Sequence, residues 1–540
     1  MMGTKARNFT PVSALSLDEL VPHDHFYRHL DRVLDLAFLR DLVQDEYTGS
    51  GHPSVDPVEF FKLQLVMFFE GMRSERQLRL ATDRLSVRWY LGFNLDEQLP
   101  EHSSLTRIRA RYGLEIFRRF FDAIVEQCQQ AGLVWGQELY FDATHVLADA
   151  SLDSLVPRFA VEARSAPQTH LAALFSDEAN QANPDTAPVT ESAGAAALQN
   201  ADEVCPQESR APTALRVDRP EPARVALAEA NATRHDWFAA AGRQQREVHG
   251  LYQRTADFRI SMTDPDATPL RLKGGGTHLG YQTHYVVDGG KRRMILGVLL
   301  TPGEVMENQP MLDLAWHVRF RFHVRPHQAT GDTTYGTLEN IAALEREDIR
   351  AYVPLPDWEH KTDYFGPRCF SYASERDVYV CPQGQPLRPY RRELGAEKVE
   401  YRAAPATCNA CPLKAQGTPS AHGRIVHRHF AEAYLDRVRA YHQGEPYAKA
   451  MRKRQVWVEP LFAEGKQWHG MRRFRLRGLR RVNSEALLIA SGQTSSVYSS
   501  SGAGAGDHSR TGRQQERSHV FGYCAACWRR LWMQRWQARP

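Results

Sequence analysis

The chain has 540 residues, enough for roughly three domains that each have their own core. Its hydrophobic content of 42% is ordinary for a globular protein, and its net charge of +4 is too small to establish a nucleic-acid partner. Residues 1–20 lack the apolar stretch of a secretory signal, and no window reaches the roughly 18 apolar residues needed to span a membrane. Eight cysteines in so long a chain do not make a disulfide scaffold. We therefore expect a cytoplasmic protein of bacterial type.

Residues 11–135 predict an all-helical domain. Pro57 stands at a favoured first position of a helix that is apolar on most sides, with Ser54 or Asp56 as its cap. Residues 74–77 match the capping box of a second helix.

A third helix, beginning near Ser103, carries arginines between its apolar positions. The inward residues are Leu105, Ile108 and Tyr112, and the interleaved arginines are Arg107, Arg109 and Arg111. Short helices with an arginine-bearing last member suit a helix-turn-helix-like DNA-binding domain. A plain helical bundle with solvated arginines fits the same pattern, so both interpretations stay open.

Residues 136–354 predict a mixed α/β layer fold. Residues 138–148 form an apolar, β-prone segment that Asp142 interrupts. A hairpin is expected at 283–300, with Asp-Gly-Gly in its turn. The elements expected after it are a helix at 308–321, a strand at 327–332, a helix at 337–347 and a strand at 349–353.

The remaining segments complete an α+β fold class. Residues 155–220 have the composition of a linker or insertion within the core, and a helical stretch of roughly 221–255 comes after it. Residues 355–445 form a Cys-containing insertion, 446–495 supply the C-terminal helices of the core, and 496–540 form a tail. We thus predict an all-helical domain followed by a mixed-sheet core with insertions.

Three acids stand at informative positions. Asp142 lies in an apolar strand, Asp332 comes after a strand in the turn 331–336, and Glu459 precedes a proline at the start of a helix. Burying an acid is costly unless a partner such as a metal ion compensates it, and three carboxylates suit a two-metal phosphoryl-transfer site. Each acid also has a structural explanation, as a strand-end cap, an Asx-turn residue and a helix N-terminal acid, respectively.

A cationic run lies after the last acid. From Lys466 to Arg481 there are seven Lys or Arg residues and no Asp or Glu. Such residues bind phosphate oxygens, although a solvated helix lysine and a general basic face explain the same run. Pro460 disfavours helical geometry at the residue before it, so we expect a helix to begin or kink at Glu459.

Taken in order, these segments resemble the DDE-type insertion-sequence transposases, whose catalytic core is RNase-H-like. The resemblance covers roughly residues 15–495 and rests on six segments: 141–146, 263–267, 279–285, 331–336, 458–462 with Lys466, and 477–479. The family's Tyr, Arg, Glu, Lys signature around the last acid is incomplete, because Gln455 stands four residues before Glu459. Arg452 and Arg454 lie nearby as possible substitutes.

The resemblance implies a DNA transposase that binds element-end inverted repeats, cleaves DNA and joins it to a target. Asp142, Asp332 and Glu459 would hold two Mg²⁺ (or Mn²⁺) ions, and the N-terminal helices would bind double-stranded DNA. Lys466 would hold a phosphate near the element end, and Arg472, Arg473 and Arg475 would track the backbone. Association with the nucleoid and a homo-oligomer on DNA are further expectations. The alternatives are an inactive, transposase-derived DNA-binding protein and a metal-dependent endonuclease without strand transfer.

The cysteines of the insertion resemble a zinc-binding segment found in some of these transposases. Cys408 and Cys411 form a Cys-x-x-Cys pair, with Cys381 upstream. Zinc requires four ligands, and the family pattern has another cysteine where this chain has Gly417. Cys369 or His422 could complete the set, and an insertion without metal is the alternative.

Overall fold

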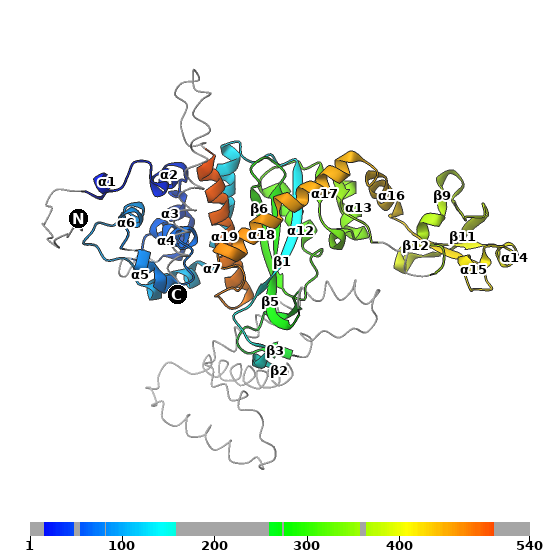
Figure 1. Cartoon of the computed structure of the whole chain (residues 1–540), viewed down its shortest axis with the longest axis horizontal. Helices are drawn as coiled ribbons and strands as arrows, with labels where there is room; N and C mark the ends of the chain where they lie inside the picture. The colour runs from blue at the N-terminus through cyan, green and yellow to red at the C-terminus, as the bar shows by residue number, and fades with distance from the viewer. Residues whose placement is uncertain are drawn as a thin grey trace, which may run out of the picture.

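The computed structural model describes residues 16–47, 54–81, 83–157, 259–272, 275–356 and 363–501. Within these ranges the fold is α+β, with N-terminal helices at one end, a mixed sheet in the centre and a smaller sheet at the other end (Figure 1). The helical stretch predicted at 221–255 and nearly all of the linker predicted at 155–220 lie outside the described residues. No described helix is both long and apolar enough to cross a membrane.

The N-terminal helices form where the capping signals predict them. The Asp56 side chain accepts a hydrogen bond from the Val58 amide at 2.7 Å, and Pro57 begins the apolar helix α4. Ser74 and Gln77 form the predicted capping box, although the helical segments that it begins, η2 and α5, are short. The elements are α1 (Leu17–Leu20), α2 (Phe26–Val33), α3 (Phe38–Leu42), η1 (Gln44–Glu46), α4 (Pro57–Phe69), η2 (Glu75–Gln77), α5 (Leu78–Ala81), α6 (Leu85–Leu91) and α7 (His102–Gln130).

The central sheet is mixed and has the order β4-β5-β1-β7-β8, with β6 also paired to β5. Its strands are β1 (Glu138–Leu147), β4 (Thr268–Arg271), β5 (Thr277–Asp288), β6 (Ile295–Pro302), β7 (Gln328–Thr330) and β8 (Arg350–Tyr352). β1 is antiparallel to β5 and parallel to β7. The predicted hairpin is β5–β6, and the predicted helices are α12 (Met311–Arg321) and α13 (Leu338–Arg346). This topology is RNase-H-like, as the sequence predicts.

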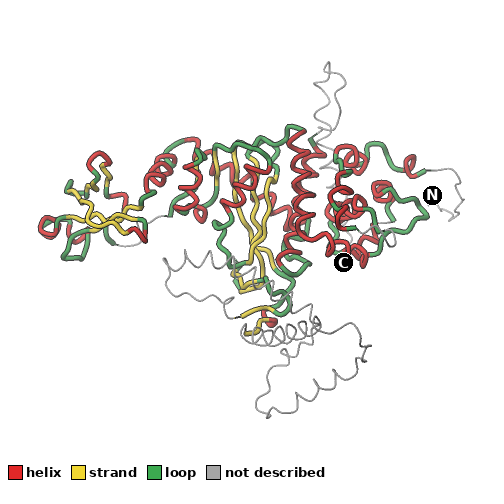
Figure 2. The backbone as a smooth tube through the Cα atoms, turned by 180° about the vertical axis from the view of Figure 1, so that it is seen from behind, coloured by secondary structure: helices red, strands yellow, loops and turns green. Residues whose placement is uncertain are grey.

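Three helices close the described chain: α17 (Glu445–Trp457), α18 (Glu459–Trp468) and α19 (Leu479–Ser500). α19 lies between the N-terminal helices and the central sheet and packs on α4, α7 and β6 (Figures 1 and 2). α19 and α4 lie very close together, because a Cβ added at Gly492 would overlap the Phe68 ring. The predicted tail boundary at 496 is therefore wrong, since α19 continues to Ser500 with buried side chains that include Tyr498.

Residues 371–429 contain the smaller sheet, ordered β13-β12-β11-β10-β9. Its strands are β9 (Ser371–Ala373), β10 (Val378–Val380), β11 (Pro386–Glu393), β12 (Lys398–Ala403) and β13 (Ile425–His429), with α14 (Pro405–Asn409) and α15 (Lys414–Gly417) beside them. This sheet has its own small core and lies at the end of the molecule remote from α1–α6 (Figure 1). The next helix, α16 (Glu432–Tyr441), packs on α13 and β8 of the central domain.

Candidate active site

Asp142 lies in the middle of β1, between β5 and β7, and is 9% exposed. Burial raises the pKa of its carboxyl group to about 6, and the nearby Arg454 guanidinium opposes this shift. Nη1 of Arg454 is 3.2 Å from Oδ2 of Asp142. The central acid of the sheet is thus buried and ion-paired.

Asp332 and Glu459 come from neighbouring elements. Asp332 lies just after β7, the strand parallel to β1, and its Oδ1 accepts a hydrogen bond from the Thr334 amide at 2.8 Å, which caps η6 (Thr333–Tyr335). Glu459 is the exposed first residue of α18. Val458 separates α17 from α18, so the predicted break at Glu459 is confirmed.

The three carboxylates share one neighbourhood. The negative charges of Asp332 and Glu459 both raise the pKa of Asp142. Even so, no three His, Cys, Asp or Glu side chains in the described ranges gather closely enough to hold a metal ion. As donors the carboxylates suit Mg²⁺, which prefers oxygen ligands, and their assembly into a metal site stays a prediction.

Two contacts fix α17 and α18 against the sheet. Nζ of Lys453 in α17 donates to Oε2 of Glu138, at the start of β1, at 2.6 Å. The ring of Phe462 in α18 stacks on Tyr285 of β5 with centroids 4.5 Å apart. Because Tyr285 is directly opposite Asp142 in the β1–β5 register, the second contact places α18 beside the central acid.

Lys466 reaches the same strand from α18. Its ammonium donates a hydrogen bond to the hydroxyl of Thr144, which lies two residues after Asp142 and therefore on the same face of β1. Burial, with a smaller effect of Arg472, lowers the pKa of Lys466. A phosphate bound near Asp142 on this face would thus lie near a partly desolvated cation.

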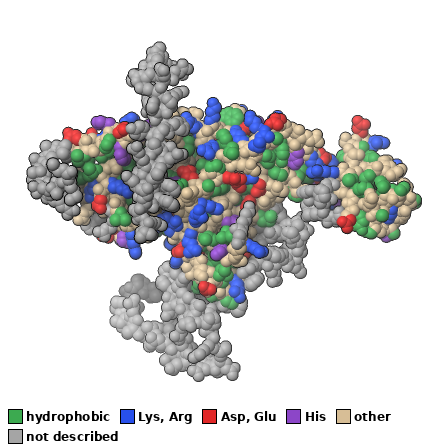
Figure 3. Space-filling model, in the orientation of Figure 1, with side chains coloured by type: hydrophobic (Ala, Val, Ile, Leu, Met, Phe, Trp, Pro, Cys, Tyr) green, Lys and Arg blue, Asp and Glu red, His purple; other side chains and the backbone are tan. Residues whose placement is uncertain are grey.

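The arginine run pairs with the end of β1 rather than forming a free loop. The Leu147 amide donates to the Arg472 carbonyl at 3.1 Å, and the Phe474 amide donates to the Leu147 carbonyl at 2.9 Å. Arg472 and Arg473 are exposed. On the face shown in Figure 3, Lys and Arg side chains gather over the central part of the molecule, with acidic side chains between them.

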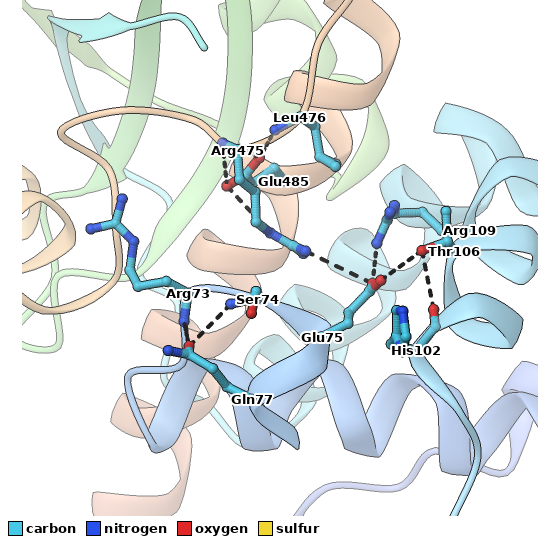
Figure 4. A network of polar contacts seen from close by, with 10 residues as sticks. All are labelled: Arg73, Ser74, Glu75, Gln77, His102, Thr106, Arg109, Arg475, Leu476 and Glu485. Atoms are coloured by element: carbon cyan, nitrogen blue, oxygen red, sulfur yellow. Dashed lines mark hydrogen bonds and ion pairs between the residues drawn. The ribbon is translucent and has the colours of Figure 1, made fainter. Parts of the chain in front are cut away.

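Arg475 differs from its two neighbours, because it lies between two acids (Figure 4). Its Nη1 is 3.9 Å from Oε1 of Glu75 in η2, and its Nε is 3.6 Å from Oε1 of Glu485 in α19. The carboxylate of Glu485 also accepts hydrogen bonds from the amides of Arg475 and Leu476. Arg475 thereby joins the N-terminal helices to the core and is less available for DNA than the sequence predicts.

Arg109 belongs to the same network. Its Nη1 contacts Oε1 of Glu75, and the two side chains are only 9% and 6% exposed (Figure 4). The prediction that Arg109 presents its guanidinium to DNA does not hold in this structure, because the group is used for a buried ion pair. Arg107 and Arg111 are exposed, and the guanidinium of Arg111 lies over the Tyr47 ring at 5.1 Å.

Asp264 and Asp266, which belong to one of the six resembling segments, hold the start of α19. The Gly478 amide donates to Oδ1 of Asp264 at 3.0 Å, and the Leu479 amide donates to Oδ2 of Asp266 at 2.6 Å. Both carboxylates are nearly fully buried, and burial raises the pKa of Asp266 to about 7. Their contacts are those of helix N-terminal acids.

Sequence reasoning did not assign the contacts of Asp142. The incomplete signature indicated Arg452 or Arg454 without deciding between them, and the ion pair with Asp142 identifies Arg454. Arg452 pairs instead with Glu445 at 2.6 Å and is exposed. Tyr335 is fully buried, which raises the pKa of its hydroxyl group. The negative charges of Asp142, Asp332 and Glu307 raise this pKa further. Glu307 stands in a loop without a strand or helix signal, so nothing in the sequence singled it out.

The cysteines of the smaller sheet do not form a metal cluster among the described residues. Cys369, Cys381, Cys408 and Cys411 are free thiols, and Cys381 and Cys408 pack against the small core. Gly417 ends α15, and a Cβ there would meet open space. Zinc binding by Cys381, Cys408 and Cys411 stays a prediction; Cys524 and Cys527 lie outside the described residues.

The strand order and the three acids from β1, the end of β7 and the start of α18 define an RNase-H-like fold with a candidate carboxylate centre. Residues 15–111 match the model of a transposase domain (DUF772), and residues 380–494 match that of a transposase DDE domain. These two matches support the predicted assignment to the DDE-type insertion-sequence transposases. Searches of curated proteins and of solved structures find no match. The second matched segment contains Glu459 and Lys466, whereas Asp142 and Asp332 lie between the two segments.

Proposed function

We propose that the protein binds the inverted repeats at the ends of its element, cleaves DNA there and transfers the cut strand to target DNA. The observations that support the proposal are that Asp332 and Glu459 lie near enough to Asp142 for their charges to raise its pKa, and that Lys466 contacts Thr144 on the strand of Asp142. Acids paired with phosphate-binding cations suit a reaction at a phosphodiester.

In this proposal the three carboxylates hold the divalent metal that DDE transposases use. When bound, Mg²⁺ supplies charge stabilisation for the attacking and leaving oxygens of an in-line displacement. Arg454 would keep Asp142 ionised and oriented until the metal ion binds. Lys466 would hold a phosphate of the element end through its charge, while Thr144 fixes the direction of its ammonium.

The exposed arginines would bind the flanking backbone. Arg472 and Arg473 lie beside the end of β1, so phosphates held there would extend away from the acids along the strand direction. Arg107 and Arg111 on α7 would add contacts from the N-terminal helices. Arg109 and Arg475 would act indirectly, because their ion pairs join the helices of the N-terminal region to this backbone track.

One observation favours a second candidate, a DNA-binding protein without catalysis. Arg454 neutralises Asp142, and Gln455 stands where the family signature has arginine. A nicking assay on element-end DNA with Mg²⁺ separates this candidate from the first. A pre-cleaved element end then separates a transposase, which joins it to target DNA, from an endonuclease, which does not.

A further inference from the structure

We infer that the outward face of β11 and β12 in the smaller sheet is a second binding surface, which takes the phosphate backbone of duplex DNA without reading its sequence. It is separate from the carboxylate neighbourhood on the central sheet. The inference rests on the proposed function, because that function makes DNA the partner.

Strand register places three arginines on this face. Arg388 is opposite Arg402, and Arg391 is opposite Glu400. Leu387, one residue before Arg388, is fully buried in the small core and therefore marks the opposite face. Like charges directly opposite each other destabilise a strand pair, so sheet stability does not account for placing Arg388 against Arg402.

The acids on the outward face of these two strands are already neutralised. Oε1 of Glu400 is 2.7 Å from Arg402, and Oε2 of Glu393 is 3.1 Å from Lys398. Arg388 and Arg391 are exposed and have no ion-pair partner within the described ranges. The face therefore keeps an unbalanced positive charge, which complements a phosphate backbone.

An exposed aromatic ring lies among these cations. A register shift between Pro389 and Arg391 leaves Tyr390 outside the ladder, and its side chain is 61% exposed. The guanidinium of Arg402 lies 3.7 Å from the ring centroid, so the ring holds Arg402 flat on the outward face. Arginines interleaved with an aromatic side chain are typical of nucleic-acid-binding surfaces.

The position of the face suits a long duplex. The inner face is covered by the small core of Phe370, Tyr379 and Tyr401, whereas Arg388 and Arg391 on the outward face are exposed to solvent. The sheet lies at the end of the molecule opposite α1–α6, with the central sheet between them (Figures 1 and 2). Contacts here would lengthen the DNA footprint beyond the carboxylates.

Arg392 provides a matched control. It is adjacent to Arg391, equally a β11 arginine and exposed, but it is opposite Val399 and so belongs to the other face. The experiment uses the full chain without divalent metal and measures fluorescence anisotropy of a labelled duplex of about 40 base pairs and arbitrary sequence, long enough to span several helical turns, over a range of salt concentrations. Circular dichroism checks that each variant is folded.

We expect Arg391→Ala to weaken binding about threefold to tenfold and to reduce the log–log salt slope by about 0.9, the effect of one lost phosphate contact. Arg388→Ala/Arg391→Ala should reduce the slope by about twice that amount, whereas Arg392→Ala should change neither quantity.

Equal effects of Arg391→Ala and Arg392→Ala would overturn the inference while leaving the proposed function intact. Full DNA affinity in the double variant would also overturn it and would favour an acidic protein as the occupant. If the parent chain bound no DNA, both the inference and the proposed function would fail.

Discussion

Arg454 and Asp142 form an ion pair at the centre of the main sheet, with 3.2 Å between Nη1 and Oδ2. The arginine comes from α17 and the acid from β1, so the pair ties the helix that precedes Glu459 to the strand that carries Asp142. The side chains are 16% and 13% exposed, and solvent therefore screens the pair little.

Removing Arg454 should destabilise the protein more than removing both charges. Arg454→Ala leaves a buried carboxylate without its partner, and we expect a loss of about 2–4 kcal/mol of unfolding free energy. Asp142→Asn in the same chain should recover part of that loss, with a coupling energy of about 1–3 kcal/mol. Chemical denaturation in EDTA of the parent, both single variants and the double variant measures this cycle. Additivity within about 0.5 kcal/mol would show that the pair is not coupled.

Lys466→Met should weaken binding of element-end DNA and lower the log–log salt slope by about 0.9, because one phosphate contact is lost. Thr144→Val is the matched control, since it removes the hydroxyl that Lys466 contacts but keeps the ammonium charge. Anisotropy titrations in EDTA would measure both variants. A parental slope in Lys466→Met would rule out the phosphate contact.

Glu75→Gln should loosen the junction between the N-terminal helices and the core. The change leaves Arg109 buried without its carboxylate and removes one of the two acids beside Arg475, and we expect a loss of about 2–4 kcal/mol. Glu115→Gln is the control, because Glu115 pairs with Arg119 on the exposed surface of α7, where such pairs contribute little. Thermal unfolding would compare the two variants. Similar shifts in Tm for both would contradict the proposed role of the network.

The sequence predicted the positions of helices and strands better than it predicted which side chains form ion pairs. The apolar strand around Asp142, the break at Glu459 and the cap at Asp56 depend on local chemistry, and the structure confirms all three. Local chemistry does not predict the contacts of Arg109 and Arg454, because each forms an ion pair with an acid that is distant in the sequence. These acids are Glu75 and Asp142, respectively.

The smaller sheet was missed for a related reason. Its strands are short or polar, and β11 carries two prolines and three arginines, which weakens any alternation of apolar and polar residues. The smaller sheet is stabilised by pairing between its strands and by the burial of Leu387 and Tyr401 in its core. Neither kind of contact can be recognised from a short stretch of sequence.

Stability should depend on pH through Asp266. Burial raises the pKa of Asp266 in the folded protein to about 7, whereas its ordinary value is 3.8. A raised carboxyl pKa means that its contribution to stability is fully present below about pH 4 and is lost as the pH rises through 7. Each pKa unit corresponds to about 1.4 kcal/mol, so the change amounts to a few kcal/mol.

Asp266→Asn removes this titration while keeping an oxygen that can accept from the Leu479 amide. We expect Tm of the parent to fall relative to that of the variant between about pH 4 and 7. Asp24→Asn, an exposed acid, serves as the control. Parallel curves for the parent and Asp266→Asn would contradict the assignment.

The central claim is that Asp142, Asp332 and Glu459 act together on DNA. Its most direct test is nicking of a duplex that carries the inverted repeats flanking the gene, with Mg²⁺ or EDTA, by the parent and by Asp142→Asn, Asp332→Asn and Glu459→Gln. We predict that the parent nicks the element end only with Mg²⁺, and that each variant binds the duplex but loses at least roughly a hundredfold in rate. A variant at any of the three acids that nicks as fast as the parent would contradict the account.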